Sequence, residues 1–303
     1  MIIVFSVSGC VKVLNDDLSA EKSKLVVNAI IAKDSLFTVN VSRTFNIFDD
    51  ESLNHLPFVE DAVVKVFKNG SYLATLTPDT LGYYQGNFYP EQGAVYSLEI
   101  SAESFEAVSC KTSLPEKIPI DHWDTVSVMD GNGEYSEINY YGKVSLKDPE
   151  NADNFYALRA TIYLETSFGD VYTDQLWLDV PEGEQELFDV GDGYQLLWSD
   201  KFLNGKEINV RFNYLQWYAG YGKDVSDTAV ITIYLRTLTY DYYSFLKTYT
   251  LYLETYNSDP FMEPVVIHNN VTNGYGIFGA YSEDSVSFNL VLPRSGLRKG
   301  GVR

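Results

Sequence analysis

The sequence is short of the residues that most often carry chemistry. Its 303 residues include only three histidines, His55, His122 and His268, and none stands in an H-x-x-H or H-E-x-x-H arrangement. Catalytic zinc sites commonly use histidines at such spacings. A G-x-S-x-G turn for an activated serine is also missing from the sequence. The sequence therefore identifies no catalytic residue, no metal ligand and no cofactor, and we expect a protein that is not an enzyme.

Positive charge is scarce as well. The chain has 22 lysines and arginines against 42 aspartates and glutamates, which gives a formal net charge of −20. Proteins that bind nucleic acid need basic patches that displace counterions, and docking on anionic lipid needs the same sign of charge. We therefore expect no nucleic-acid partner. The acidic residues are dispersed, which is typical of a solubilising surface.

Long apolar runs and cysteines are rare. No run approaches the roughly 20 apolar residues that a transmembrane helix needs. The two cysteines are Cys10 and Cys110. The N-terminal sequence, described next, indicates that Cys10 is lipidated. Cys110 is then left without a disulfide partner. It lies in an alternating segment, residues 105–112, and we expect a buried, inert thiol in a strand.

The first ten residues carry a specific signal. Val7, Ser8 and Gly9 precede Cys10, after a short apolar run. Small residues directly before a cysteine form the lipobox of bacterial lipoproteins, where the cysteine sulfur receives a lipid and a peptidase cuts before it. We expect residues 1–9 to be the remnant of a signal peptide and an acylated Cys10, carrying palmitate or similar chains, to hold the protein on a membrane. The alternative is an ordinary N-terminal strand that contains a cysteine.

The first half of the chain has the pattern of β-structure. Residues 10–24 are predicted to be a lipidated tether, and residues 25–116 an immunoglobulin-like β-sandwich. Apolar and polar residues alternate over 37–45, as in a half-buried strand, and Asn69 with Gly70 predicts a hairpin turn. About seven short strands with turn signals between them are typical of such a sandwich. Prolines near residue 117 indicate a linker.

The second half is predicted to be a larger antiparallel β domain, residues 120–293, followed by a disordered tail, 294–303. It carries one amphipathic helix near 241–256, capped by Thr239 or Asp241. The helical stripe recurs at a period near 3.6 and consists of Tyr242, Phe245, Leu246, Tyr249, Tyr252, Leu253 and Tyr256. We expect this stripe to pack across one sheet. The fold class is thus mainly β, in two domains.

Two acidic turns allow two interpretations. Residues 130–134 place oxygen-bearing side chains at alternate positions, as the first half of a calcium loop does, and Asp189 with Asp192 is similar. Neither continues to the glutamate of an EF-hand, so ordinary hairpin turns are favoured. Four tryptophans and 24 tyrosines could stack on sugars or grip peptides, although most are expected in the core.

The segment after the helix is distinctive. Residues 259–265 read DPFMEPV, and residues 269–280 read NNVTNGYGIFGA. With the lipobox and the β-rich first half, they resemble the Bacteroidetes lipoprotein family known only as domain of unknown function 4249, over about residues 20–292. The resemblance implies a β-rich lipoprotein of the outer membrane or cell surface, often encoded beside a TonB-dependent outer-membrane receptor. It implies no catalytic residues.

The glycine-rich run after the helix is a candidate site for a ligand or partner. Glycines permit a close approach that other residues do not. The candidate residues are Asn270, Asn273, Gly274, Tyr275, Gly276 and Phe278. The alternative is a bulged strand that passes under the helix. The run matches G-x-G-x-x-G by letter, but a strand follows it, so nucleotide binding is not expected.

These observations together predict a non-enzymatic, lipid-anchored protein of the outer membrane that faces the cell exterior. It would bind a nutrient or act as an accessory subunit of a TonB-dependent transporter, with the second domain binding and the first acting as a spacer. One alternative is a structural or adhesive envelope protein without a small ligand. Another is a surface hydrolase, whose paired carboxylates would be neighbours only in space.

Overall fold

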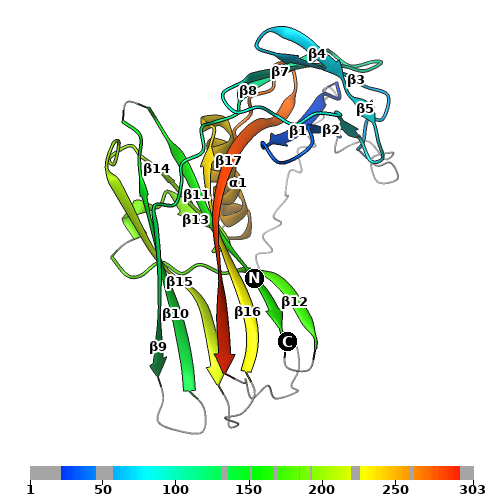
Figure 1. Ribbon diagram of the computed structural model, residues 1–303. Coiled ribbons are helices and arrows are strands. Elements are labelled where there is room, and N and C mark those ends of the chain that lie inside the picture. The colour runs from blue at the N-terminus through cyan, green and yellow to red at the C-terminus, as the bar shows by residue number, and fades with distance from the viewer. Residues whose placement is uncertain are drawn as a thin grey trace, which may run out of the picture.

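The computed structural model describes residues 22–45, 57–130, 136–150, 152–166, 169–183, 185–191, 193–219, 226–258 and 263–293. The predicted lipobox with Cys10, most of the tether and the tail lie outside these ranges. The fold is mainly β with a single α-helix among the described residues, as predicted, and its strands form two sandwiches joined by one long strand (Figure 1). No helix in the described ranges is long and apolar enough to cross a lipid bilayer.

The first sandwich consists of one end of a ten-stranded sheet, which continues into the second sandwich, and a four-stranded sheet. One contains β1 (Leu25–Ile31), β2 (Thr38–Arg43), β6 (Tyr83–Gln85) and β5 (Thr77–Pro78), and the other β4 (Ser71–Thr75), β3 (Val63–Lys68), β7 (Val95–Ser101) and β8 (Val108–Ser113). Alternate residues of each strand face inward, so both sheets contribute to one apolar core. Cys110 is buried in it, as predicted, and burial raises the pKa of its thiol to about 12.

The second sandwich is larger. Its three-stranded sheet has the order β15 (Glu207–Ala219), β10 (Ser136–Lys147), β9 (His122–Asp130). The facing sheet contains β11 (Phe155–Glu165), β12 (Val171–Leu176), β13 (Val190–Gly191), β14 (Leu196–Ser199), β16 (Ser226–Leu238) and β17 (Tyr275–Pro293). The predicted alternation in residues 208–214 is confirmed, because Ile208, Val210, Phe212 and Tyr214 are at most 2% exposed.

Strand β17 belongs to both sandwiches. Residues 275–280 of β17 pair in parallel with β1. Residues 281–293 pair antiparallel with β16. Val271, Phe278 and Ala280 are buried in the core of the first sandwich. Part of the segment predicted to lie within a 120–293 domain therefore completes the first sandwich. Local alternation indicates a strand but not the sheet that the strand will join.

Helix α1 (Tyr240–Ser258) packs on β17, β13 and β11. Thr239 caps it, because the Tyr242 amide N–H donates to Thr239 Oγ1 at 3.4 Å. The side chain that is most buried is Tyr243, which lies outside the predicted stripe. Tyr249 and Leu253 of that stripe are 42% and 41% exposed, so only the first part of the stripe packs on the sheet. The stripe prediction therefore fails at Tyr249 and Leu253, in the second half of the helix.

Candidate functional site

The predicted binding loop is tied into the protein by its own side chains. Asn270 brackets the backbone of Phe278: the Phe278 N–H donates to Asn270 Oδ1 at 2.8 Å, and Asn270 Nδ2 donates to the Phe278 carbonyl at 2.9 Å. Phe278 is fully buried. A neutral amide that satisfies both backbone groups of one residue replaces a missing strand neighbour. Asn270 and Phe278 therefore stabilise the junction between the two sandwiches.

The glycines of this loop allow strand β1 to approach the backbone closely. A Cβ on Gly276, whose φ is +113°, would lie 2.0 Å from the Val27 carbonyl oxygen, and one on Gly274 would lie 2.6 Å from the Leu25 carbonyl oxygen. Both approaches are closer than any real Cβ tolerates. The remaining predicted residues, Asn273 and Tyr275, have exposed side chains at the start of β17. The structure thus brings all six residues into one turn and strand, and a partner-binding role for them stays a prediction.

A different constellation lies on the outer face of the three-stranded sheet. The strand register places Lys143 of β10 directly between Asp124 of β9 and Arg211 of β15. Directly opposed residues on one face have Cβ atoms about 4.5–5.5 Å apart, and like charges in such positions repel. Two cations side by side are unusual in a chain with a net charge of −20. An anion bound here would contact both cationic groups.

A loop forms a wall beside this cationic pair. After β12 the chain crosses to the free edge of β15, where Asp179 and Asn213 exchange backbone hydrogen bonds of 2.9 and 2.7 Å. The chain then continues through Pro181 to a short 3-10 helix, η2 (Gln185–Leu187). This crossing closes one side of the second sandwich and brings the loop against the outer face of β15.

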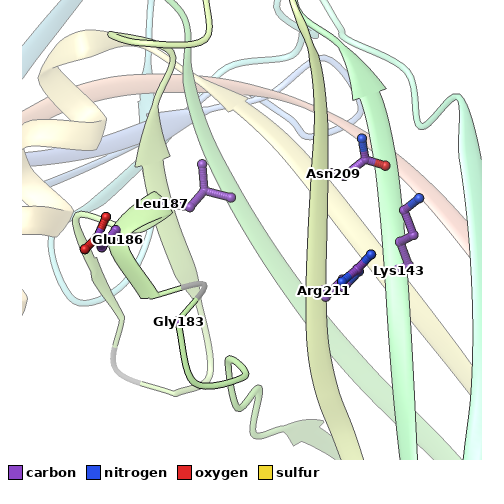
Figure 2. A pocket seen from close by; sticks show the side chains of 6 residues that line it. All are labelled: Lys143, Gly183, Glu186, Leu187, Asn209 and Arg211. Carbon is purple, nitrogen blue, oxygen red and sulfur yellow. The ribbon is translucent and has the colours of Figure 1, made fainter.

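The space between the loop and the strands is a hollow of about 440 Å³ (Figure 2). It is lined by Lys143, Gly183, Glu186, Leu187, Asn209 and Arg211. In Figure 2 Leu187 projects from the loop toward the strands that carry the two cations. A second hollow of about 300 Å³ shares Lys143 and Arg211 and adds apolar surface from Val126, Tyr141 and Pro181. We call the two hollows together the Lys143–Arg211 groove.

One polar side chain of the groove is held in place from below. The Ser145 hydroxyl, which is buried, donates to Asn209 Oδ1 at 2.7 Å, and Asn209 Nδ2 donates to Glu207 Oε1 at 3.2 Å. These bonds fix the orientation of the Asn209 amide next to Arg211. A site whose polar groups are already oriented loses less entropy when a ligand binds.

The acidic turns considered for calcium divide into two cases. Asp189 accepts hydrogen bonds from the Tyr243 hydroxyl, from Lys247 Nζ at 2.9 Å and from the Ser199 N–H at 3.1 Å. Burial raises the pKa of Asp189, but these hydrogen bonds outweigh it and lower the pKa overall. Its carboxylate therefore joins the loop before β13 to helix α1. Asp192 and residues 131–135 lie outside the described ranges.

Histidines and other metal-binding side chains are dispersed. Over the described ranges, no three His, Cys, Asp or Glu residues lie together in a way that could hold a metal ion. His268 Nε2 is 2.8 Å from Asp241 Oδ1, a helix-to-loop contact, whereas His122 lies on β9. His55 is outside the described residues. The alternative that the protein is a surface hydrolase specifies no pair of carboxylates, and it stays a prediction.

The tryptophans are mostly structural. Trp198 is fully buried and stacks on Tyr156 with ring centroids 5.2 Å apart, and Trp123 packs on Phe288 at 5.0 Å. Trp177 is the exception, because it is 52% exposed and meets Tyr194 edge to face. Its indole N–H donates to Asp179 Oδ1 at 2.7 Å. An exposed aromatic pair therefore lies at the start of the loop that forms the groove.

Sequence reasoning missed Lys143 and Arg211. Each is an ordinary polar residue in an alternating strand, and the alternation correctly predicts that both point away from the core. Their adjacency depends on the register of β10 and β15, which lie far apart in the sequence. The bulge between Tyr140 and Tyr141 shifts that register, and no local signal predicts it.

Comparison with known proteins adds a family and no function. A family model described as a domain of unknown function, DUF4249, matches residues 11–287. The match spans both sandwiches and ends within β17, the long strand that joins them. A search of curated proteins finds no match.

Proposed function

The chain belongs to the DUF4249 family, and from that premise we propose that it is a non-enzymatic, lipid-anchored protein of the outer membrane whose second sandwich binds a small anionic solute. The anchor is inferred from Val7, Ser8, Gly9 and Cys10. The binding role is inferred from the Lys143–Arg211 groove. The solute would be a nutrient that the protein presents to a TonB-dependent receptor at the cell surface.

The single observation that carries the binding role is the direct opposition of Lys143 and Arg211 on neighbouring strands. A carboxylate or phosphate offers two or more oxygens, and a guanidinium can donate to two of them in a planar fork. The adjacent ammonium adds a second charge. Leu187, Val126 and Tyr141 supply apolar surface for the body of the solute. A sugar acid or a sugar phosphate has both features.

The proposed anchor makes moderate affinity sufficient. A protein held on a membrane by acyl chains explores two dimensions, which raises its effective concentration near a membrane-embedded receptor. A groove that is open to solvent also releases its ligand readily. Both properties favour delivery to a transporter over storage of the solute.

A titration tests the binding role. Glucuronate, inorganic phosphate and uncharged glucose are added to the purified full-length protein, and binding is followed by calorimetry. We expect the two anions to bind and compete, glucose to bind more weakly, and added salt to weaken the anions. The double variant Lys143→Gln/Arg211→Gln should lose at least about tenfold in affinity, equivalent to roughly 1.4 kcal/mol.

The matched control is Lys65→Gln/Lys111→Gln, which makes the same change of charge at exposed positions of the first sandwich. Equal loss in this control would show that only net charge matters. Failure of both anions to bind the unmodified protein would remove the binding role.

Purification from native outer membranes tests the location and the partner. The tagged full-length protein is solubilised and its companions are identified by mass spectrometry, beside a Cys10→Ala variant. We expect an acylated protein together with a TonB-dependent receptor, and neither in the variant. Recovery of an acylated protein alone would instead favour the structural or adhesive envelope role.

A further inference from the structure

The three-stranded sheet has one closed edge and one open edge. Its β15 edge is joined at Asn213 to the crossing loop, through the bridge from Asp179. At the other edge, β9 pairs with β10 on one side, and no described strand pairs with it on the other. Figure 1 shows β9 as an outer strand, with no labelled strand beyond it. An unpaired strand of nine residues presents a row of unused backbone groups.

The direction of these backbone groups follows from three contacts. The Thr125 N–H donates to Asp124 Oδ1 at 2.9 Å instead of to β10. The carbonyls of Tyr141 and Ser145 on β10 both point toward β9, because they accept from Thr125 Oγ1 and from the Asp121 N–H. Hydrogen-bonding direction alternates along an antiparallel strand. The backbone N–H and C=O groups of residues 123, 125, 127 and 129 therefore point away from β10, toward the open edge of the sheet.

The usual protections of an edge strand are absent from β9. Native proteins protect edges with proline, lysine, bulges or covering loops. Residues 122–130 contain neither proline nor lysine, and their register with β10 runs without a break from Ser145 to Glu137. One aspartate, Asp124, satisfies one N–H. The strand is therefore able to accept another strand.

Apolar surface is exposed on the same side of the sandwich. Val126, Val128 and Met129 on β9 are 56%, 47% and 63% exposed. On the inner face Trp123 and Phe288 are only partly buried, although they pack against the second core. Phe212 and Tyr214 on the closed side are at most 1% exposed. The open edge thus leaves part of the core uncovered.

We propose that a second copy of this chain covers this edge, with the two β9 strands antiparallel and a two-fold axis at Val126. The register is self-complementary. It sets Trp123 opposite Met129, Asp124 opposite Val128 and Thr125 opposite Ser127 of the other copy. Like charges do not meet, and His122 falls opposite Asp130 at both ends.

The proposed register also satisfies the backbone. Residues 125 and 127 both have outward-pointing groups, so they form a hydrogen-bonded pair across the axis, in which the Thr125 N–H exchanges Asp124 Oδ1 for the Ser127 carbonyl of the other copy. Val126 meets its symmetry equivalent as a non-hydrogen-bonded pair, in which side chains are closest. The result is one six-stranded sheet shared by two molecules, with an isologous interface. Val126 also lines the Lys143–Arg211 groove, but the interface uses the β9 backbone and neither of the two cations, so each proposal can fail without the other.

Sedimentation of the purified full-length protein tests the association. We expect a concentration-dependent dimer with a Kd in the micromolar range, as for a small interface. Ser127→Pro removes an outward-pointing N–H, and Val128→Asp places a carboxylate directly opposite Asp124 of the other copy, so each should weaken the dimer at least about tenfold. The control is Val171→Asp, which makes the same substitution at a residue of β12 that is 53% exposed.

Disulfide trapping tests the register. In a Cys10→Ser background, Val126→Cys brings two symmetry-related cysteines to a Cα separation of about 4.5–5.5 Å, within disulfide range. We expect spontaneous covalent dimers from Val126→Cys and far fewer from Val128→Cys. A monomer at every concentration up to about 100 µM, with no trapping at either position, would overturn the proposal. Preferential trapping at position 128, or a dimer that survives Val128→Asp, would overturn this interface.

Discussion

The first sandwich is closed by a strand from the far end of the chain, whereas the second leaves one side of its core partly open (Figure 1). In the first, β17 approaches β1 so closely that two glycines are needed at the contact. In the second, Trp123 and Phe288 reach the edge of the sheet and are only partly covered. Two sandwiches of similar construction thus differ in how completely their edges are used.

This difference separates stability from binding. Tight packing without voids stabilises a fold but leaves no room for a ligand. The groove, the exposed Trp177 and the open β9 edge all lie in the second sandwich. We therefore expect substitutions at the β1–β17 contact to act on folding, and substitutions on the three-stranded sheet to act on binding.

The largest effect is expected at the β1–β17 contact. Gly276→Ala places a Cβ 2.0 Å from the Val27 carbonyl oxygen at a φ of +113°, so the two strands must separate. Steric overlap and backbone strain together should lower the free energy of unfolding by about 3–5 kcal/mol. Urea unfolding measures the change.

The control for that substitution is Gly70→Ala, in the hairpin turn of the same sandwich. Gly70 also has a positive φ, +79°, but nothing lies within 4 Å of its added Cβ. Backbone strain alone should cost about 1 kcal/mol. Similar losses for the two variants would mean that the close approach of β17 contributes nothing beyond the cost of a positive φ.

An intermediate effect is expected where the linker meets β17. Asp284 accepts from Lys117 Nζ at 2.8 Å and from the Ile120 N–H at 2.9 Å, which fixes the linker between the sandwiches. Burial raises the pKa of Asp284, but these hydrogen bonds outweigh it and the pKa is lowered overall. A lowered carboxyl pKa stabilises the fold above the unfolded-state pKa, near 3.9, and this contribution is lost as the pH falls through the folded-state pKa.

Asp284→Asn should therefore cost about 1 kcal/mol at pH 7, allowing for solvent screening, and less near pH 3. Unfolding of the variant and the unmodified protein at both pH values measures the difference. A cost that is the same at pH 7 and pH 3 would show that the ionised form of Asp284 is not what stabilises the contact.

The smallest effect is expected in the groove. Lys143→Gln removes the repulsion from Arg211 and also the attraction to Asp124, so the free energy of unfolding should change by no more than about 0.3 kcal/mol while anion affinity falls. Thermal unfolding without ligand measures the first quantity. A clear loss of stability would indicate that Lys143 has a structural role and would weaken the contrast between the two sandwiches.

Much of the fold follows from local patterns. Alternation predicts the strands, and the inward positions of β15 confirm it. The 3.6-residue period predicts the helix to within about two residues at each end. The pairing of β17 with β1 could not be predicted, because the two segments lie at opposite ends of the sequence. The burial of Tyr243 in place of the outer stripe depends on where the sheet beneath the helix ends.

The candidate site was harder to predict than the fold. The conspicuous glycine run proved to shape a strand contact, because Gly274 and Gly276 face backbone carbonyls of β1. The inconspicuous Lys143 and Arg211 became neighbours only through strand register. A rare residue type attracts attention in a sequence, but adjacency in space decides what two common residues can do together.

The parallel pairing of β1 and β17 has a mechanical consequence. Tension applied through the residues that precede β1 pulls along that strand, and the hydrogen bonds to β17 lie across the direction of pull. They resist as a group in shear, whereas strands pulled apart from one end break their bonds one after another. Under force applied from the N-terminal side, both sandwiches would therefore stay folded until all the β1–β17 hydrogen bonds break together.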